Sequence, residues 1–215
     1  MSSKSLIDIA YTEIRQKIIL GDFMPGTLLS ENELANELNM SRTPIRTAIS
    51  HLESEGFVVS LKNRGILVKE ISVKEILDMI EVMISFQIQA LDSIIERGCP
   101  IDIPELEKCL NKQIEASRQD NYPEHVRYSH MFSRCIISVL NNQVMLQNMD
   151  SYQDKIIMIA TINWKRTPHQ PHYSYNRINE SLYQALASSD FEGAKQIVKE
   201  ALRNTRNRVV TEGRM

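Results

Sequence analysis

The sequence is poor in the residue types that mark several classes of protein. It has only three cysteines, Cys99, Cys109 and Cys135, and their spacing fits neither a metal site nor a redox motif. An odd number of unpaired thiols is typical of a protein in a reducing compartment. Seven glycines, seven prolines and 6% aromatic residues favour a helical fold. We therefore expect a helix-rich cytoplasmic protein with reduced cysteines.

Long apolar runs are also missing. The longest candidate lies near residues 156–162, well short of the roughly 18 residues that a membrane-spanning helix needs. No signal peptide is recognisable, because the first residues are polar and then amphipathic. The length of 215 residues suits one large or two small domains, and a hydrophobic content of 42% is enough to form a core. We expect no membrane segment.

Charge alone does not indicate a nucleic-acid-binding protein. The formal net charge is −2, and in residues 1–70 eight lysines and arginines are offset by nine aspartates and glutamates. A DNA-binding surface must therefore be a local patch and not a basic domain.

The stretch 30–52 has the pattern of two short helices joined by a tight turn. Ser30 is a candidate N-cap with Glu33 three residues on, as in a capping box. For the second helix, Thr43 is the expected cap and Pro44 suits the first turn, with Arg42 just before the helix. This layout is typical of a helix-turn-helix, whose second helix enters the major groove of DNA.

The second helix of this stretch is two-faced. Its apolar residues recur at helical spacing and comprise Ile45, Ala48, Ile49 and Leu52. The opposite face carries hydroxyl and guanidinium groups, from Thr43, Arg46, Thr47 and Ser50. Arginine binds guanine edges or phosphate, and hydroxyls bind phosphate. The alternative is an ordinary helical hairpin with two surface arginines.

The flanking segments complete a winged helix. Residues 6–20 form an amphipathic helix, and residues 57–61 and 66–69 form two strands joined by the turn Lys62-Asn63-Arg64-Gly65. Lys62 and Arg64, at the tip, can reach phosphate or the minor groove. The alternative for this segment is a plain surface hairpin.

Residues 5–69 resemble the winged-helix domain of the GntR family of bacterial transcription regulators. The resemblance runs through residues 18–21, 25–26, 29–31, 34–35, 41–46, 48–49, 52–56 and 64–65. It implies that Arg42 and Arg46 contact bases or nearby phosphate, that Ser41 and Thr43 hold the DNA backbone, and that Arg64-Gly65 places the wing. Asn32 stands where many members carry arginine, which weakens one expected contact. The predicted DNA-binding residues are Asn32, Ser41, Arg42, Thr43, Arg46, Lys62, Asn63, Arg64 and Gly65.

From Ser72 onward we find no strand pattern. Helices are predicted at residues 73–97, 103–120, 123–141, 143–164, 174–188 and 190–211. Antiparallel helices of this length form a bundle that can enclose a small ligand. The fold class is therefore mainly α, with a DNA-binding domain at 1–70 and an all-α effector and dimerisation domain at 71–215.

The second half resembles the FCD subgroup of the same family, whose helical domain binds a small effector and usually a metal. The subgroup's metal ligands are an aspartate and three histidines, and these positions hold Ser129, Ser133, Asn179 and Ala201 here. His130 offers a rival register, but its partner four residues earlier would be Val126. These residue types are poor metal donors, so we expect no metal and no cofactor.

The predicted pocket is metal-free. The subgroup's usual arginine and glutamate on the first helix of this domain are replaced by Met83 and Gln87. Without a metal or that arginine, a carboxylate effector loses its main anchors. We therefore expect a neutral or largely apolar effector, or none. The candidate effector-binding residues are Met83, Gln87, Ser129, Ser133 and Asn179.

Other residues of the helical half are interpreted as structural. The loop histidines His169 and His172 lack a third donor nearby, and Trp164 is expected to close the bundle. The apolar stripe that includes Ile156 and Ala160 is interpreted as core or dimer contact. The arginines of the last helix, Arg208 among them, are interpreted as solvated cations near a helix C-terminus.

Together these features predict a transcription repressor that binds a palindromic operator as a homodimer and responds to a small effector. An enzymatic bundle fused to a winged helix is a rival, but no acid–base pair, nucleophile or phosphate loop supports it. A second rival is a DNA-binding dimer whose pocket has degenerated.

Overall fold

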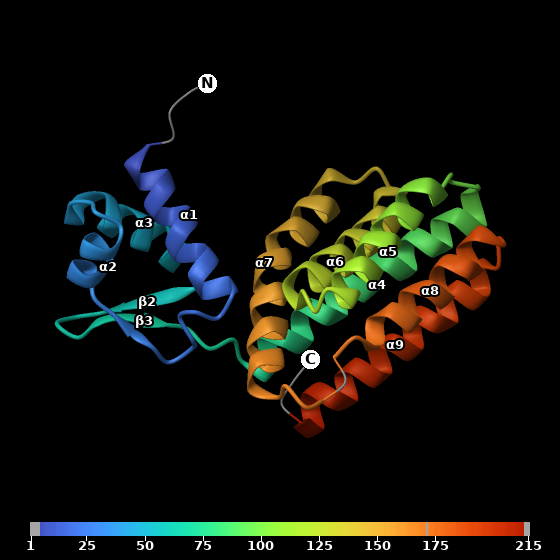
Figure 1. Ribbon diagram of the computed structural model, residues 1–215. Helices are drawn as coiled ribbons and strands as arrows, with labels where there is room; N and C mark the ends of the chain where they lie inside the picture. Colours follow the sequence, from blue (N-terminus) through green and yellow to red (C-terminus); the bar gives the residue numbers. More distant parts are fainter. Residues whose placement is uncertain (1–4, 171, 213–215) are drawn as a thin grey trace. The chain divides into compact units, whose positions relative to one another are not determined.

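The computed structural model describes residues 5–170 and 172–212, and it divides the chain into two compact units, Met1–Ile71 and Ser72–Met215 (Figure 1). The first unit combines helices with a small antiparallel sheet, and the regular structure in the described part of the second unit is all helical. The mainly α fold class predicted from the sequence is confirmed.

The described part of the first unit, residues 5–71, consists of three helices and a small sheet. In chain order they are α1 (Leu6–Ile19), β1 (Leu28–Leu29), α2 (Glu31–Glu37), α3 (Arg42–Ser54), β2 (Val58–Leu61) and β3 (Gly65–Val68). α1 packs on α3, and the buried residues Ile14 and Ile18 of α1 meet the same core as Ile45 and Leu52 of α3. The apolar residues that recur at helical spacing in both helices are therefore buried in the core, as the sequence predicts.

The start of α3 corrects the sequence interpretation. Ser41, in an extended conformation, is the N-cap residue, although its side chain makes no capping hydrogen bond. Thr43, predicted as the cap, is the second residue of the helix, and Arg42 is its first. Pro44 is tolerated at the third position because the first turn of a helix has no partners for its N–H groups.

The sheet contains a strand that the sequence did not reveal. β1 pairs antiparallel with β3, which pairs antiparallel with β2, so the order is β1-β3-β2. β1 has only two residues, too few for an alternating pattern. Lys62, Asn63 and Arg64 form the turn between β2 and β3, and Asn63 adopts a left-handed conformation with φ of 60°.

Gly65 closes this turn at a crowded point. Its φ is +102°, and a Cβ atom there would lie 2.7 Å from the carbonyl oxygen of Leu29 in β1. Glycine is thus required both by the backbone conformation and by the approach of β1.

The described residues of the second unit, 72–170 and 172–212, form six helices. They are α4 (Val73–Arg97), α5 (Ile103–Arg118), α6 (Tyr122–Ser138), α7 (Gln143–Arg166), α8 (Ser174–Ala187) and α9 (Phe191–Glu212). α6 packs against both α5 and α7, and α4 packs against α9 (Figure 1). Side chains cap the start of five of these described helices, and the capping residues are Ser72, Asp102, Asn121, Asn142 and Asp190.

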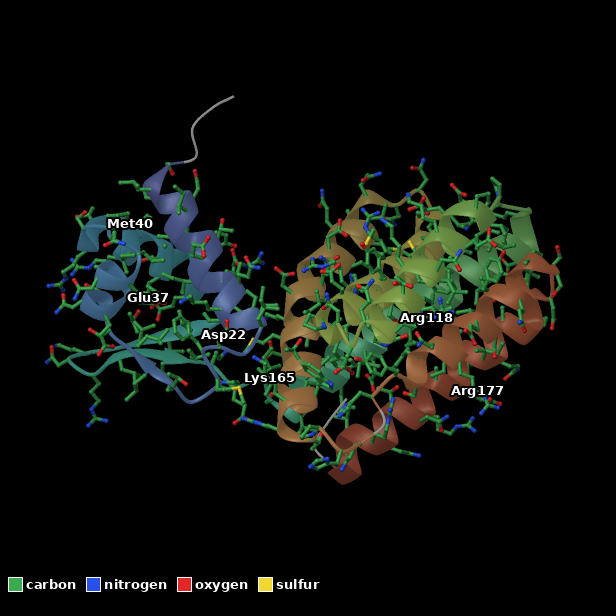
Figure 2. The ribbon with its side chains drawn as sticks, in the orientation of Figure 1. Asp22, Glu37, Met40, Arg118, Lys165 and Arg177 are labelled. Carbon is green, nitrogen blue, oxygen red and sulfur yellow. The ribbon has the colours of Figure 1, made fainter. Side chains whose placement is uncertain are left out.

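The core of the bundle lies between α4, α5, α6, α8 and α9. Its buried members include Leu91, Leu106, Phe132, Ile136 and Leu182. Charged side chains cover the outside, for example Arg118 on α5 and Arg177 on α8 (Figure 2). In the part of the chain that is described, no helix is both long and apolar enough to cross a membrane.

Substitution of Gly65 tests the close approach of β1. Gly65→Ala should destabilise the first unit by about 1–3 kcal/mol, because it adds backbone strain and a clash with β1. Gly26→Ala is the matched control, since Gly26 also has a positive φ but its Cβ would meet nothing within 4 Å. Urea unfolding followed by circular dichroism measures both. Equal losses in the two variants would contradict the role assigned to the contact with Leu29.

Candidate functional site

The N-terminal end of α3 presents a polar surface. Ser41, Arg42, Thr43 and Arg46 are exposed, whereas the intervening Ile45 is buried. The side chains of Arg42 and Arg46 are 56% and 65% exposed, so both guanidinium groups are accessible to a partner. The structure thus brings these four predicted residues together on one helical face.

Glu31, the first residue of α2, holds both arginines. Arg42 Nη2 and Nε donate to Glu31 Oε2 over 2.8 and 3.3 Å. Arg46 Nε donates to Oε1 over 3.0 Å and its Nη2 donates to Oε2 over 2.9 Å. One carboxylate therefore sets the two guanidinium groups side by side.

The electrostatics of this cluster follow from those bonds. The hydrogen bonds from Arg46, and then those from Arg42, lower the pKa of Glu31 to about 2. Glu31 is therefore ionised at any physiological pH, and the cluster carries one net positive charge. Glu31 lies on another helix, 11 residues before Arg42 and 15 before Arg46, so no local sequence pattern predicts these contacts.

The wing is attached to α3 by a second carboxylate. Glu53 accepts hydrogen bonds from the backbone N–H of Ser60, over 2.6 Å, and from its hydroxyl, over 2.8 Å. These bonds lower the pKa of Glu53. The tip residues Lys62, Asn63 and Arg64 are exposed, as is Asn32 on α2.

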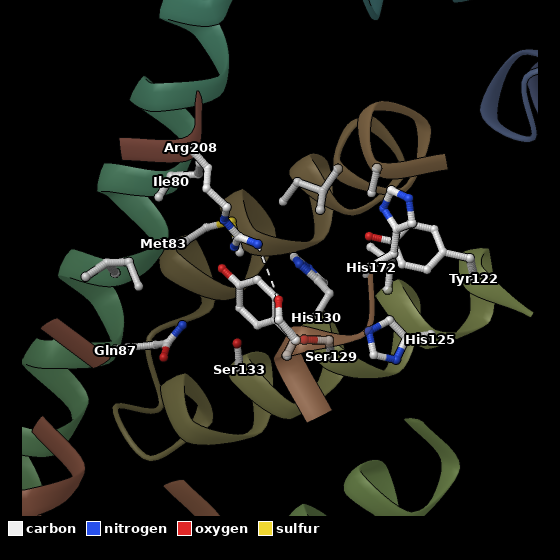
Figure 3. A pocket seen from close by; sticks show the side chains of 16 residues that line it. Ile80, Met83, Gln87, Tyr122, His125, Ser129, His130, Ser133, His172 and Arg208 are labelled. Atoms are coloured by element: carbon white, nitrogen blue, oxygen red, sulfur yellow. Dashed lines mark hydrogen bonds between the residues drawn. The ribbon is translucent and has the colours of Figure 1, made fainter. Parts of the chain in front are cut away.

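A cavity of about 120 Å³ lies inside the helical unit (Figure 3). Met83 and Gln87 of α4 and Ser129 and Ser133 of α6 line it. Four of the five residues predicted to bind an effector are thus brought together.

Asn179, the fifth, lies behind the lining. It is 4% exposed, and its Nδ2 donates to Gln113 Oε1 over 2.8 Å and to Ser129 Oγ over 3.1 Å. Both of its donor hydrogens are used inside the protein. Asn179 therefore positions Ser129 and does not itself face the cavity.

Two buried histidines contribute neutral rings to the lining. Burial lowers the pKa values of His125 and His130 to about 4, and the Met149 carbonyl near His130 only partly opposes this. Tyr122 stacks on His125 and on Trp164, with ring centroids 5.6 and 5.7 Å apart. Trp164 thus packs at this end of the cavity.

Some lining residues had been interpreted otherwise. Ile156 and Ala160, expected in the core or a dimer contact, are buried and in addition line the cavity, and His172, expected in a surface loop, lines it too. Arg208, interpreted as a solvated cation, also belongs to the lining. Its long side chain reaches in from α9, which sequence spacing cannot show (Figure 3).

The metal positions of the FCD pattern do not fit a metal here. Ser129 and Asn179 hydrogen-bond to each other, and Ala201 is a buried apolar residue. Among the described residues, no group of three or more histidine, cysteine, aspartate or glutamate side chains is placed to hold a metal ion.

Comparison with known proteins assigns each of the two units to a known family of domains. Residues 6–68 match the family described as bacterial regulatory proteins, gntR family, and residues 78–204 match the FCD domain. The Nta operon transcriptional regulator of Aminobacter aminovorans is 27% identical over 70% of this chain and 72% of its own. The gluconate operon transcriptional repressor of Bacillus subtilis is 29% identical over 72% of this chain and 64% of its own.

A solved structure shares the fold. It is a transcriptional regulator GntR from Rhodococcus sp. RHA1, with a TM-score of 0.81, 20% identity and coverage of 96% of this chain and 98% of the other. The matched families consist of regulators and not enzymes. The chain therefore belongs to the GntR family of bacterial transcription regulators, and its helical unit is an FCD domain.

Proposed function

We propose that this regulator is a cytoplasmic repressor that binds a palindromic DNA operator as a homodimer. α3 of each protomer enters the major groove, and the tip of each wing contacts the adjacent backbone. A small molecule in the pocket of the FCD domain modulates this binding.

The paired arginines on α3 carry the proposal. Arg42 and Arg46 are exposed at the N-terminal end of the helix and share the Glu31 carboxylate. An N-terminal helix turn is the part of a recognition helix that reaches base edges, and arginine binds O6 and N7 of guanine. Two neighbouring guanidinium groups are therefore suited to guanine-containing half-sites.

We propose a dimer because the DNA-contacting surface of a single helix-turn-helix is small. One helix-turn-helix contacts only a few base pairs, so two copies related by a two-fold axis supply the specificity. Repression is favoured by similarity to the gluconate operon transcriptional repressor.

The pocket supplies a route to regulation. A ligand changes DNA affinity only if it binds one arrangement of the protein better than another. The cavity is lined by residues from α4, α6, α7, α8 and α9, so an occupant contacts most of the bundle at once. The alternative hypothesis is a DNA-binding dimer whose pocket binds no effector. It predicts that no small molecule alters operator affinity.

Selection of bound duplexes from a random pool tests the proposal. The full chain should enrich a two-fold symmetric motif with guanines in each half-site. Enrichment of an asymmetric motif would contradict recognition by a symmetric dimer. No enrichment at all would contradict sequence-specific binding.

Arg46→Ala should weaken binding to the selected operator by about 1–3 kcal/mol and relax preference at one base position, because a bidentate contact is lost. Fluorescence anisotropy on operators with single base changes measures both effects. Arg118→Ala is the control, since it removes a similarly exposed arginine, 74% exposed, from α5. If Arg46→Ala binds the operator as tightly as Arg118→Ala does, Arg46 is not one of the residues that contact the bases.

Arg64→Ala should weaken binding to operator and unrelated duplexes alike. The wing is proposed to contact phosphate, so the slope of log affinity against log salt concentration should flatten by about one ion. Titrations at several salt concentrations measure this slope. A loss restricted to the operator would show instead that the wing reads sequence.

Glu31→Gln separates the positioning of the arginines from their charge. Removal of the carboxylate charge should raise affinity for unrelated DNA, because repulsion from phosphate disappears. The ratio of operator to unrelated affinity should fall, because the two guanidinium groups lose their common anchor. A raised or unchanged ratio would show that Glu31 does not position Arg42 and Arg46 for base contacts.

A further inference from the structure

Arg208 is poorly satisfied where it lines the pocket. Its Nε atom is buried and makes no hydrogen bond with any described residue. Its terminal nitrogens make only long bonds, from Nη1 to Ser174 Oγ over 3.3 Å and from Nη2 to Thr205 Oγ1 over 3.5 Å. Figure 3 shows the guanidinium group directed into the cavity. A guanidinium group with five donors is thus left with free donor capacity toward the pocket.

The charge of Arg208 has no counterion in the lining. Among the described residues that line the cavity there is no aspartate or glutamate. Two histidines of the lining, His125 and His130, do not compete for an anion, because burial lowers their pKa values and keeps them neutral near pH 7. A cation that is partly removed from water without a partner is costly, and a bound anion relieves this cost.

We infer that the pocket binds a small organic monoanion whose carboxylate is held by Arg208. The inference rests on the proposed effector role of this pocket. The prediction of a neutral or apolar effector considered only positions 83 and 87 and the missing metal ligands. Arg208 supplies the positive charge from another helix, α9.

The rest of the lining defines the remainder of the ligand. Its apolar members are Ile80, Ile84, Val126, Ile156 and Ala160. Hydroxyl groups of Ser129 and Ser133 can bind a second oxygen atom. The volume, about 120 Å³, is slightly below that of a cavity of roughly 150 Å³ that admits benzene. A cavity of this size suits a short acyl chain with one carboxylate, which the planar guanidinium group binds through two bonds.

Matched pairs of acids and amides test the charge requirement. Isothermal titration calorimetry of the full chain uses acetate, propionate and butyrate, each against its neutral amide. At least one carboxylate should bind, with its amide at least tenfold weaker. If none of the three carboxylates binds, or if the amides bind equally well, the inference is overturned.

Variants of Arg208 test the anchor. Arg208→Met, which keeps the length of the side chain, should lose at least tenfold in affinity for the carboxylate, and Arg208→Lys should retain part of it. Arg203→Met is the control, because Arg203 is exposed on the same helix. Circular dichroism checks that each variant folds. Carboxylate affinity in folded Arg208→Met equal to wild type would overturn the assignment.

DNA release is measured separately, by fluorescence anisotropy of the operator complex with the same carboxylate. Release at concentrations that fill the pocket supports both the anion site and the effector role. Arg208-dependent binding without any change in operator affinity supports the anion site and contradicts the proposed regulation.

Discussion

The apolar stripe of α3 determines which side chains the first unit turns outward. Ile45, Ala48, Ile49 and Leu52 are at most 3% exposed, and each large member stabilises the domain by about 1.5–3 kcal/mol through burial. A rotation of the helix that turned Arg42 or Arg46 inward would expose this stripe. Burial of one face thus fixes the opposite face, and Glu31 then fixes the two guanidinium groups that lie on it.

The helical unit uses burial in a different way. Its core cluster fills the space between α4, α5, α6, α8 and α9, but part of the bundle stays open as a cavity that several of the same helices line. The lining is mostly apolar or neutral, so the charge of Arg208 dominates its electrostatics. Without metal ligands the cavity lacks one means of binding an anion, and the guanidinium group of Arg208 provides another.

Local patterns predicted most of the fold because helices of this chain are long, amphipathic and well capped. The family, the fold class and the winged helix followed from residues such as Ser41-Arg42 and the turn before Gly65. β1 was not predicted because two residues are too few to show the alternation of polar and apolar side chains that indicates a strand. The pocket was predicted only in part, since Ser129 and Gln87 came from the resemblance, whereas the entry of Arg208 from α9 depends on tertiary packing. Glu31 was missed for the same reason.

Methylation interference on the selected operator tests the central claim most directly, because dimethyl sulfate marks N7 of guanine in the major groove and N3 of adenine in the minor groove. The account predicts that N7 methylation of guanines at two-fold related positions blocks binding, since Arg42 and Arg46 donate to those atoms. Interference confined to adenine N3, or to one half of the operator, would contradict recognition by α3 of two protomers.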